Sequence, residues 1–161
     1  MAGRDGDCTV MSPFYPLAQV IADLATIRAL DFSVFPGFWD LTPEQAQAAS
    51  NGTGPGSWSN DSRRVLTDVE PEGARLAAIV HDIDYCCPDK SRYLFHCANH
   101  DFRVNQRIWA RTRNFLEREA AECVAELQFD AVELWGWDAW MAGDTFAELT
   151  PRDNAGPERL A

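Results

Sequence analysis

The sequence is poor in positive charge. Its 161 residues include 14 Lys and Arg against 25 Asp and Glu, which gives a formal net charge of −11. A surface of this sign does not attract phosphate backbones or anionic lipid headgroups, so we expect no nucleic-acid partner. It suits a bound cation or a basic partner, although most acidic domains are simply well solvated.

The chain also lacks long apolar runs and a secretion signal. No run approaches the roughly 20 residues of a membrane span. The start, MAGRDGDCTVMSPF, has no basic segment followed by an apolar core, so no signal peptide is expected. The cysteine count of five is odd. We therefore expect mostly reduced thiols and synthesis in a cytoplasm, with localisation otherwise open.

Length and composition predict one domain with one core. We expect an N-terminal arm at 1–14, a single helical domain over 15–149 and a C-terminal tail at 150–161. Polar ends of this kind are usually disordered unless something holds them. Our hypothesis is that protein partners in a larger assembly, such as a virion, hold both arms.

The first half of the domain predicts helices separated by turns. Apolar residues at helical spacing indicate a helix over 15–30, with Pro16 in its first turn. Thr42 is a predicted N-cap, because Pro43 follows it and Gln45 can close a capping box. The glycines and proline of SNGTGPG should end this second helix.

The second half predicts the core helices of a mainly α fold. One apolar helix should run over 72–87 and end before Pro88. A long antiparallel helix should cover about 97–127, and a third pattern begins at Asp130. The polar stretch 57–71 fits an exposed loop or a small β-hairpin.

The stretch AIVHDIDYCC, residues 78–87, places polar side chains inside an apolar helix. His81 lies on an alanine-rich stripe, and Asp101 is the polar member of an inward stripe on the next helix. A buried carboxylate needs a partner, and His81 is the obvious one. An aspartate that holds one ring nitrogen leaves the other free as a general base. No serine or cysteine is placed as a nucleophile, so water is the natural attacking group.

A calcium ion fits the same region. Asp82 projects sideways from the helix, and with carbonyl oxygens of a glycine loop it could complete a site for a hard cation. Such a cation would polarise a substrate carbonyl and stabilise an oxyanion.

These residues together resemble the phospholipase A2 superfamily, closest to its short parvoviral and phage-type branches. The resemblance rests on NGTGPGSW, HDIDY and HDFRVNQ, and it covers about residues 50–116. It implies a Ca²⁺-dependent hydrolase that cleaves the sn-2 ester of a phospholipid, at a membrane interface if active, and a phage or phage-derived origin. It implies that His81 is the general base, that Asp101 orients it and that Tyr85 is the family's tyrosine. The implied calcium ligands are Asp82, Gly54 and Gly56, with Gly52 a further candidate.

The chain departs from the family pattern in three places. The gap from Gly56 to His81 is long, Asp84 stands where secreted members have a cysteine, and Val104 stands where a phenylalanine is usual. None of these changes removes a catalytic group. They leave open a retained fold without activity, in which His81 and Asp101 only cross-link two helices.

Two other interpretations stay open. The chain could be a structural component of a phage virion or tail that uses its arms and a tryptophan face for assembly. Near-helical spacing places Trp135 and Trp140 in the core and leaves Trp137 more exposed. A zinc-binding adaptor would instead use the cysteines and histidines around His96 and His100, although their spacing matches no zinc motif that we recognise.

Overall fold

The structure is a computed structural model, and it describes residues 14–50 and 71–142. Within these ranges the chain forms six α-helices, one short 3₁₀ helix and no strand, which confirms the mainly α prediction. Stretch 57–71, where a hairpin was considered, falls almost wholly outside the described residues, as do most of the predicted arm and all of the predicted tail. The elements are α1 (Leu17–Ala29), η1 (Phe38–Asp40), α2 (Pro43–Ala49), α4 (Glu72–Asp84), α5 (Arg92–Ala110), α6 (Phe115–Trp135) and α7 (Trp137–Ala142).

Local sequence signals set the start of α2 as predicted. The hydroxyl of Thr42 accepts from the backbone N–H of Gln45 at 3.2 Å, and the Gln45 side chain accepts from the backbone N–H of Thr42 at 2.9 Å. Pro43 occupies the first helical position, where its missing N–H costs nothing. The predicted capping box is therefore confirmed.

The long helix predicted over 97–127 is wrong. Two helices occupy this stretch, because α5 ends at Ala110 and α6 begins at Phe115. The side chain of Asn114 caps α6 by accepting from the backbone N–H of Glu117 at 3.1 Å. The helix expected to start at Asp130 is also wrong, since α6 continues through that residue to Trp135.

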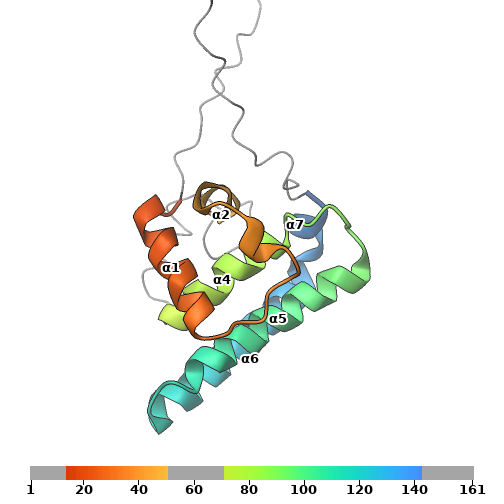
Figure 1. Cartoon of the computed structure of the whole chain (residues 1–161). Helices are drawn as coiled ribbons and strands as arrows, with labels where there is room; N and C mark the ends of the chain where they lie inside the picture. Colours follow the sequence, from red (N-terminus) through yellow and green to blue (C-terminus); the bar gives the residue numbers. More distant parts are fainter. Residues whose placement is uncertain (1–13, 51–70, 143–161) are drawn as a thin grey trace, which may run out of the picture.

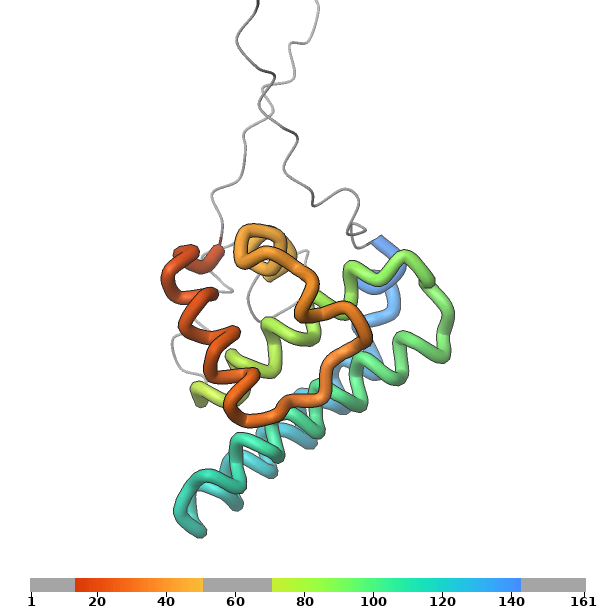
Figure 2. The backbone as a smooth tube through the Cα atoms, in the orientation of Figure 1, coloured from red at the N-terminus to blue at the C-terminus, as the bar shows by residue number. Residues whose placement is uncertain are grey.

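The helices are arranged around α4. In Figure 1, α4 lies between the α1–α2 pair and the long α5–α6 hairpin, and the tube in Figure 2 shows α5 and α6 running side by side. Most of α4 is buried, and Leu76, Ile79, Val80 and Ile83 are completely enclosed. An all-round apolar helix of this kind belongs at the centre of a core.

Contacts along α4 show that α5 runs antiparallel to it. Gly73, at the start of α4, faces the ring of Trp109 near the end of α5. His81 contacts Phe102 in the middle of α5, and Tyr85 contacts Phe95 near its beginning. These three contacts pair the start of α4 with the end of α5 and the end of α4 with the start of α5.

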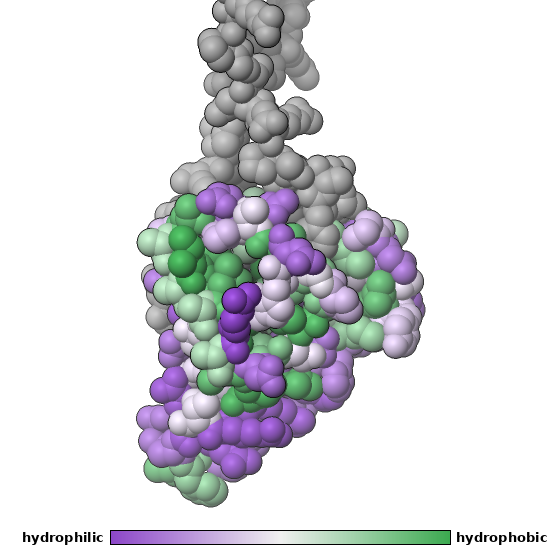
Figure 3. Space-filling view, in the orientation of Figure 1, coloured by the Kyte–Doolittle hydropathy of each residue, from purple (hydrophilic) through white to green (hydrophobic). Residues whose placement is uncertain are grey.

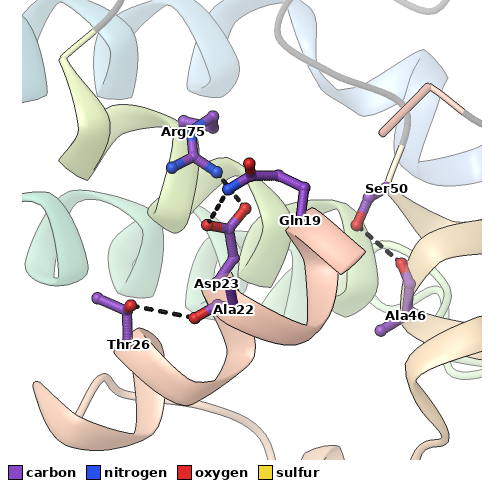
Figure 4. A network of polar contacts seen from close by, with 7 residues as sticks. All are labelled: Gln19, Ala22, Asp23, Thr26, Ala46, Ser50 and Arg75. Atoms are coloured by element: carbon purple, nitrogen blue, oxygen red, sulfur yellow. Dashed lines mark hydrogen bonds and ion pairs between the residues drawn. The ribbon is translucent and has the colours of Figure 1, made fainter. Parts of the chain in front are cut away.

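A buried ion pair ties α1 to α4. Asp23 of α1 is buried and pairs with Arg75 of α4, while Gln19 donates from Nε2 to Asp23 Oδ1 at 2.9 Å. Figure 4 shows both side chains converging on the Asp23 carboxylate. Because a buried carboxylate is costly without partners, this contact helps to fix α1 against the central helix.

Candidate functional site

His81 lies in the last turn of α4, enclosed by aromatic rings. Its ring centroid is 4.2 Å from that of Tyr85 and 4.7 Å from that of Phe102. Only 8% of the residue is exposed. Burial disfavours the charged imidazolium and lowers the pKa of His81 to about 4, and a hydrogen bond to Asn99 offsets part of this effect. His81 is therefore a neutral imidazole at pH 7.

Asn99 of α5 fixes the orientation of the His81 ring. The Nε2 atom of His81 lies 2.9 Å from Asn99 Oδ1, and the Tyr85 hydroxyl donates to the same oxygen at 3.0 Å. Because an amide oxygen only accepts, Nε2 carries the proton and the lone pair is on Nδ1. Asn99 is completely buried, so both contacts are shielded from water.

A second layer of contacts holds Asn99 in this orientation. Its Nδ2 donates to Glu133 Oε1 of α6 at 2.8 Å, so the amide oxygen must face His81. The other carboxylate oxygen of Glu133 lies 2.8 Å from His96 Nδ1. A continuous polar chain thus runs from α4 through α5 to α6 and back to α5, where it ends at the half-exposed ring of His96.

Asp101 does not form the predicted pair with His81. Its Oδ1 accepts from the Ser33 hydroxyl at 3.0 Å and lies 3.7 Å from Nδ1 of His100. The cause is helical geometry, because residues 99 and 101 point about 200° apart around α5. Asp101 therefore ties the connection after α1 to α5, and Asn99 occupies the position expected for the aspartate.

Tyr85 lies where the prediction placed it, one turn beyond His81. Burial, together with the negative charges of Asp82, Glu133 and Asp84, raises the pKa of its hydroxyl, which stays protonated and can only donate to Asn99. Gly136, between α6 and α7, makes room for this hydroxyl, because an added Cβ would lie 2.5 Å from it.

The residues predicted to bind calcium fall partly outside the described residues. Gly52, Gly54 and Gly56 are not described, and Asp82 is a half-buried residue beside His81. Asp84 is buried, and its Oδ1 has no hydrogen-bond partner among residues 14–50 and 71–142; burial and Asp101 raise the pKa of its carboxyl well above the usual value.

No group of three or more His, Cys, Asp or Glu side chains in 14–50 and 71–142 is arranged to hold a metal ion. A calcium ion near Asp82 would therefore need further oxygen ligands from residues outside these ranges, and the carbonyls of the three glycines are the candidates.

The sequence-based prediction did not include two residues of the hydrogen-bond network around His81, Asn99 and Glu133. Asn99 was not predicted as the partner of His81, because its amide carries no charge and Asp101 in the HDF of residues 100–102 was a charged alternative. The signal for it was helical spacing, since Phe95, Asn99, Phe102 and Gln106 share the buried face of α5. Glu133 could be placed only once α6 was known to pass Asp130.

Comparisons with known proteins identify no relative. A scan against protein-family models, a search of the curated proteins and a search of the solved structures each found no match to this chain. In the part of the chain that the structure describes, no helix is long and apolar enough to span a bilayer. The four cysteines in that part form no disulfide with one another.

Proposed function

We propose that the chain is a calcium-dependent, phospholipase A2-like ester hydrolase in which His81 activates water. The observation that carries the proposal is the state of the His81 ring, which is neutral, hydrogen-bonded through Nε2–H and carries its lone pair on Nδ1. A base with this protonation state and a fixed ring can remove a proton from water at neutral pH. The phospholipid substrate and its sn-2 ester come from the family resemblance.

Each residue of the network has a separate role in the proposed hydrolysis. His81 Nδ1 takes the proton from the attacking water, and Asn99 holds the ring so that Nδ1 keeps one direction. Tyr85 donates to the same amide oxygen and restricts its movement. Asp82 and the glycines at 52, 54 and 56 would hold Ca²⁺, which supplies Lewis-acid polarisation of the ester carbonyl.

Burial makes His81 a weak base, and the amide at position 99 offsets this effect only in part. A carboxylate there would stabilise the imidazolium, whereas a neutral amide does so only through its dipole. The pKa of about 4 lies well below the operating range of most general bases. The proposed enzyme should therefore work slowly, but its base should remain unprotonated from about pH 5 upward.

The test is fatty-acid release from mixed phospholipid vesicles, with calcium and with a chelator. Wild type is compared with His81→Gln and with His100→Gln, a matched change at a histidine that is exposed on α5. We expect calcium-dependent release by wild type and His100→Gln and none by His81→Gln. Absence of release from folded wild type in calcium would refute the proposal.

A second candidate function is that of a structural component, such as a virion or tail protein, and one observation favours it. Helix α6 carries an apolar stripe on the side opposite its packed residues Ala121 and Ala125. Leu116, Leu127 and Leu134 on this stripe are 77%, 71% and 70% exposed. Exposed leucines that share one face of a helix commonly mark a contact with another protein.

The charge along this leucine stripe indicates which partner fits. Glu117, Glu119 and Asp130 flank or interrupt it and are exposed. A second copy of this acidic chain would bring like charges together, whereas a helix with leucines and lysines would satisfy both features. We therefore propose a basic amphipathic segment of another protein as the occupant.

A pair of synthetic helices tests the assembly alternative. One carries leucines with lysines, and the other carries the same leucines with glutamates. We expect the lysine peptide alone to bind wild type, and Leu127→Gln and Asp130→Lys each to weaken it. Equal binding of the lysine peptide to wild type and both variants would contradict the assignment of this face.

A further inference from the structure

An apolar groove lies on the side of α4 away from His81. Its volume is about 360 Å³, within the usual range of about 300–1,000 Å³ for small-molecule sites. Buried side chains of Phe38, Ala46 and Ile83 form its floor. Since Ile83 is two residues from His81, it projects about 200° away around α4, so the groove is separate from the His81 network.

The rim of this groove is apolar and open to solvent. Ile21 of α1 is 49% exposed and Trp39 of η1 is 40% exposed, although both are large hydrophobic side chains. Figure 3 shows hydrophobic side chains gathered over α1 and the region beside it, whereas hydrophilic ones predominate lower down over α5 and α6. Exposed apolar surface around a hollow marks a place where an apolar ligand gains from burial.

Arg28 is the charged residue that lines the groove, and its setting is unusual for this acidic chain. Its guanidinium lies 4.3 Å from the centre of the Trp39 ring, stacked at the rim. None of the ion pairs among the described residues involves Arg28, although acidic residues outnumber basic ones in the sequence by 25 to 14. The guanidinium is therefore positioned to bind an anion from solution.

We propose that the groove binds a single-chain carboxylate amphiphile, a molecule of the fatty-acid class. The aliphatic chain would lie on Phe38, Ala46 and Ile83, and the carboxylate would pair with the guanidinium of Arg28. A purely apolar ligand would leave Arg28 unused, and a cationic amphiphile would be repelled by it. The groove contains no residue of the His81 network, so this proposal does not depend on hydrolysis at His81.

Calorimetric titration of the full chain with dodecanoate, below the concentration at which it forms micelles, tests the proposal. Dodecyltrimethylammonium serves as the cationic control, because the net charge of −11 would favour it if binding were only general attraction. Arg28→Gln removes the predicted contact, and Arg111→Gln makes the same change at an exposed arginine outside the groove. Ala25→Trp places a bulky ring at an exposed lining position without disturbing the core.

The expected pattern is specific. Wild type, Arg111→Gln and His81→Gln should bind dodecanoate alike and more tightly than the ammonium compound. Arg28→Gln should weaken dodecanoate binding about tenfold, as loss of one charge-assisted contact predicts, and Ala25→Trp should abolish it while melting normally. Absence of binding to folded wild type, equal binding by Arg28→Gln, or tighter binding of the ammonium compound would overturn the assignment.

Discussion

Acid should destabilise the protein through His81 by an amount that can be worked out. The pKa of the histidine is about 6.5 in the unfolded chain and about 4 in the folded one, because burial disfavours the imidazolium. Between these values the unfolded state binds more protons than the folded state, so stability falls as the pH falls. A difference of about 2.5 units corresponds to about 3 kcal/mol, since one unit is about 1.4 kcal/mol.

Urea unfolding of wild type and His81→Gln between pH 4 and 7.5 measures this contribution. Other groups, including the buried carboxyl of Asp84, titrate in both proteins and cancel in the difference. We expect wild type to lose about 3 kcal/mol more than the variant across this range. Parallel stability curves for the two proteins would refute the conclusion that His81 is buried as a neutral ring.

Three further predictions follow from packing and burial. Gly73→Ala should reduce stability by about 1–3 kcal/mol in urea unfolding, because the added Cβ would lie 2.2 Å from the Trp109 ring. Asp23→Ala should cost about 3–5 kcal/mol by leaving Arg75 unpaired, and adding Arg75→Ala should recover part of that loss in a double-mutant cycle. Asp84→Asn should stabilise the protein at pH 7 and less so at pH 4. The reason is that a carboxyl whose pKa is raised on folding contributes stability that is lost as the pH rises. An Asp84→Asn effect that does not change with pH would contradict this explanation.

Local signals in the sequence were enough to predict much of the fold. The capping box at Thr42 involves residues three apart, so its geometry is contained in the sequence itself. The helix predicted over 72–87 exists as Glu72–Asp84, because its apolar residues surround it on all sides. These features depend little on which other helix packs nearby.

The misjudged features depend on tertiary contacts. Asn114 caps α6 in the middle of a stretch whose apolar spacing continues on both sides, so periodicity did not reveal the break. Trp135 was expected in the core but is exposed, whereas Trp140 is buried as expected. The rotation of α6 about its own axis relative to α5 decides whether Trp135 is buried. The spacing of apolar residues within one helix does not determine that rotation.

The contacts of His81 were predicted in part: Tyr85 lies beside it, and the predicted pair with Asp101 is wrong. His81 and Tyr85 are fixed by their four-residue spacing on one helix, so the sequence placed them together. The rotation of α5 about its own axis decides which of its residues faces His81. A shift of two residues, or about 200°, replaces Asp101 with Asn99 at that position. A preference for charged partners favoured the aspartate over the amide.

The pH profile of calcium-dependent ester hydrolysis tests the central claim most directly. It compares wild type with the double variant Asn99→Asp, Glu133→Gln, in which the glutamine side chain can still donate to position 99. We predict a wild-type rate that rises through about pH 4 and is then level, since His81 loses its proton there. In the variant the rise should move upward by about 1–3 pH units, because a carboxylate stabilises the imidazolium. Hydrolysis with the same profile in both proteins, or no hydrolysis by folded wild type at any pH, would contradict the claim that His81 is the base and Asn99 its orienting partner.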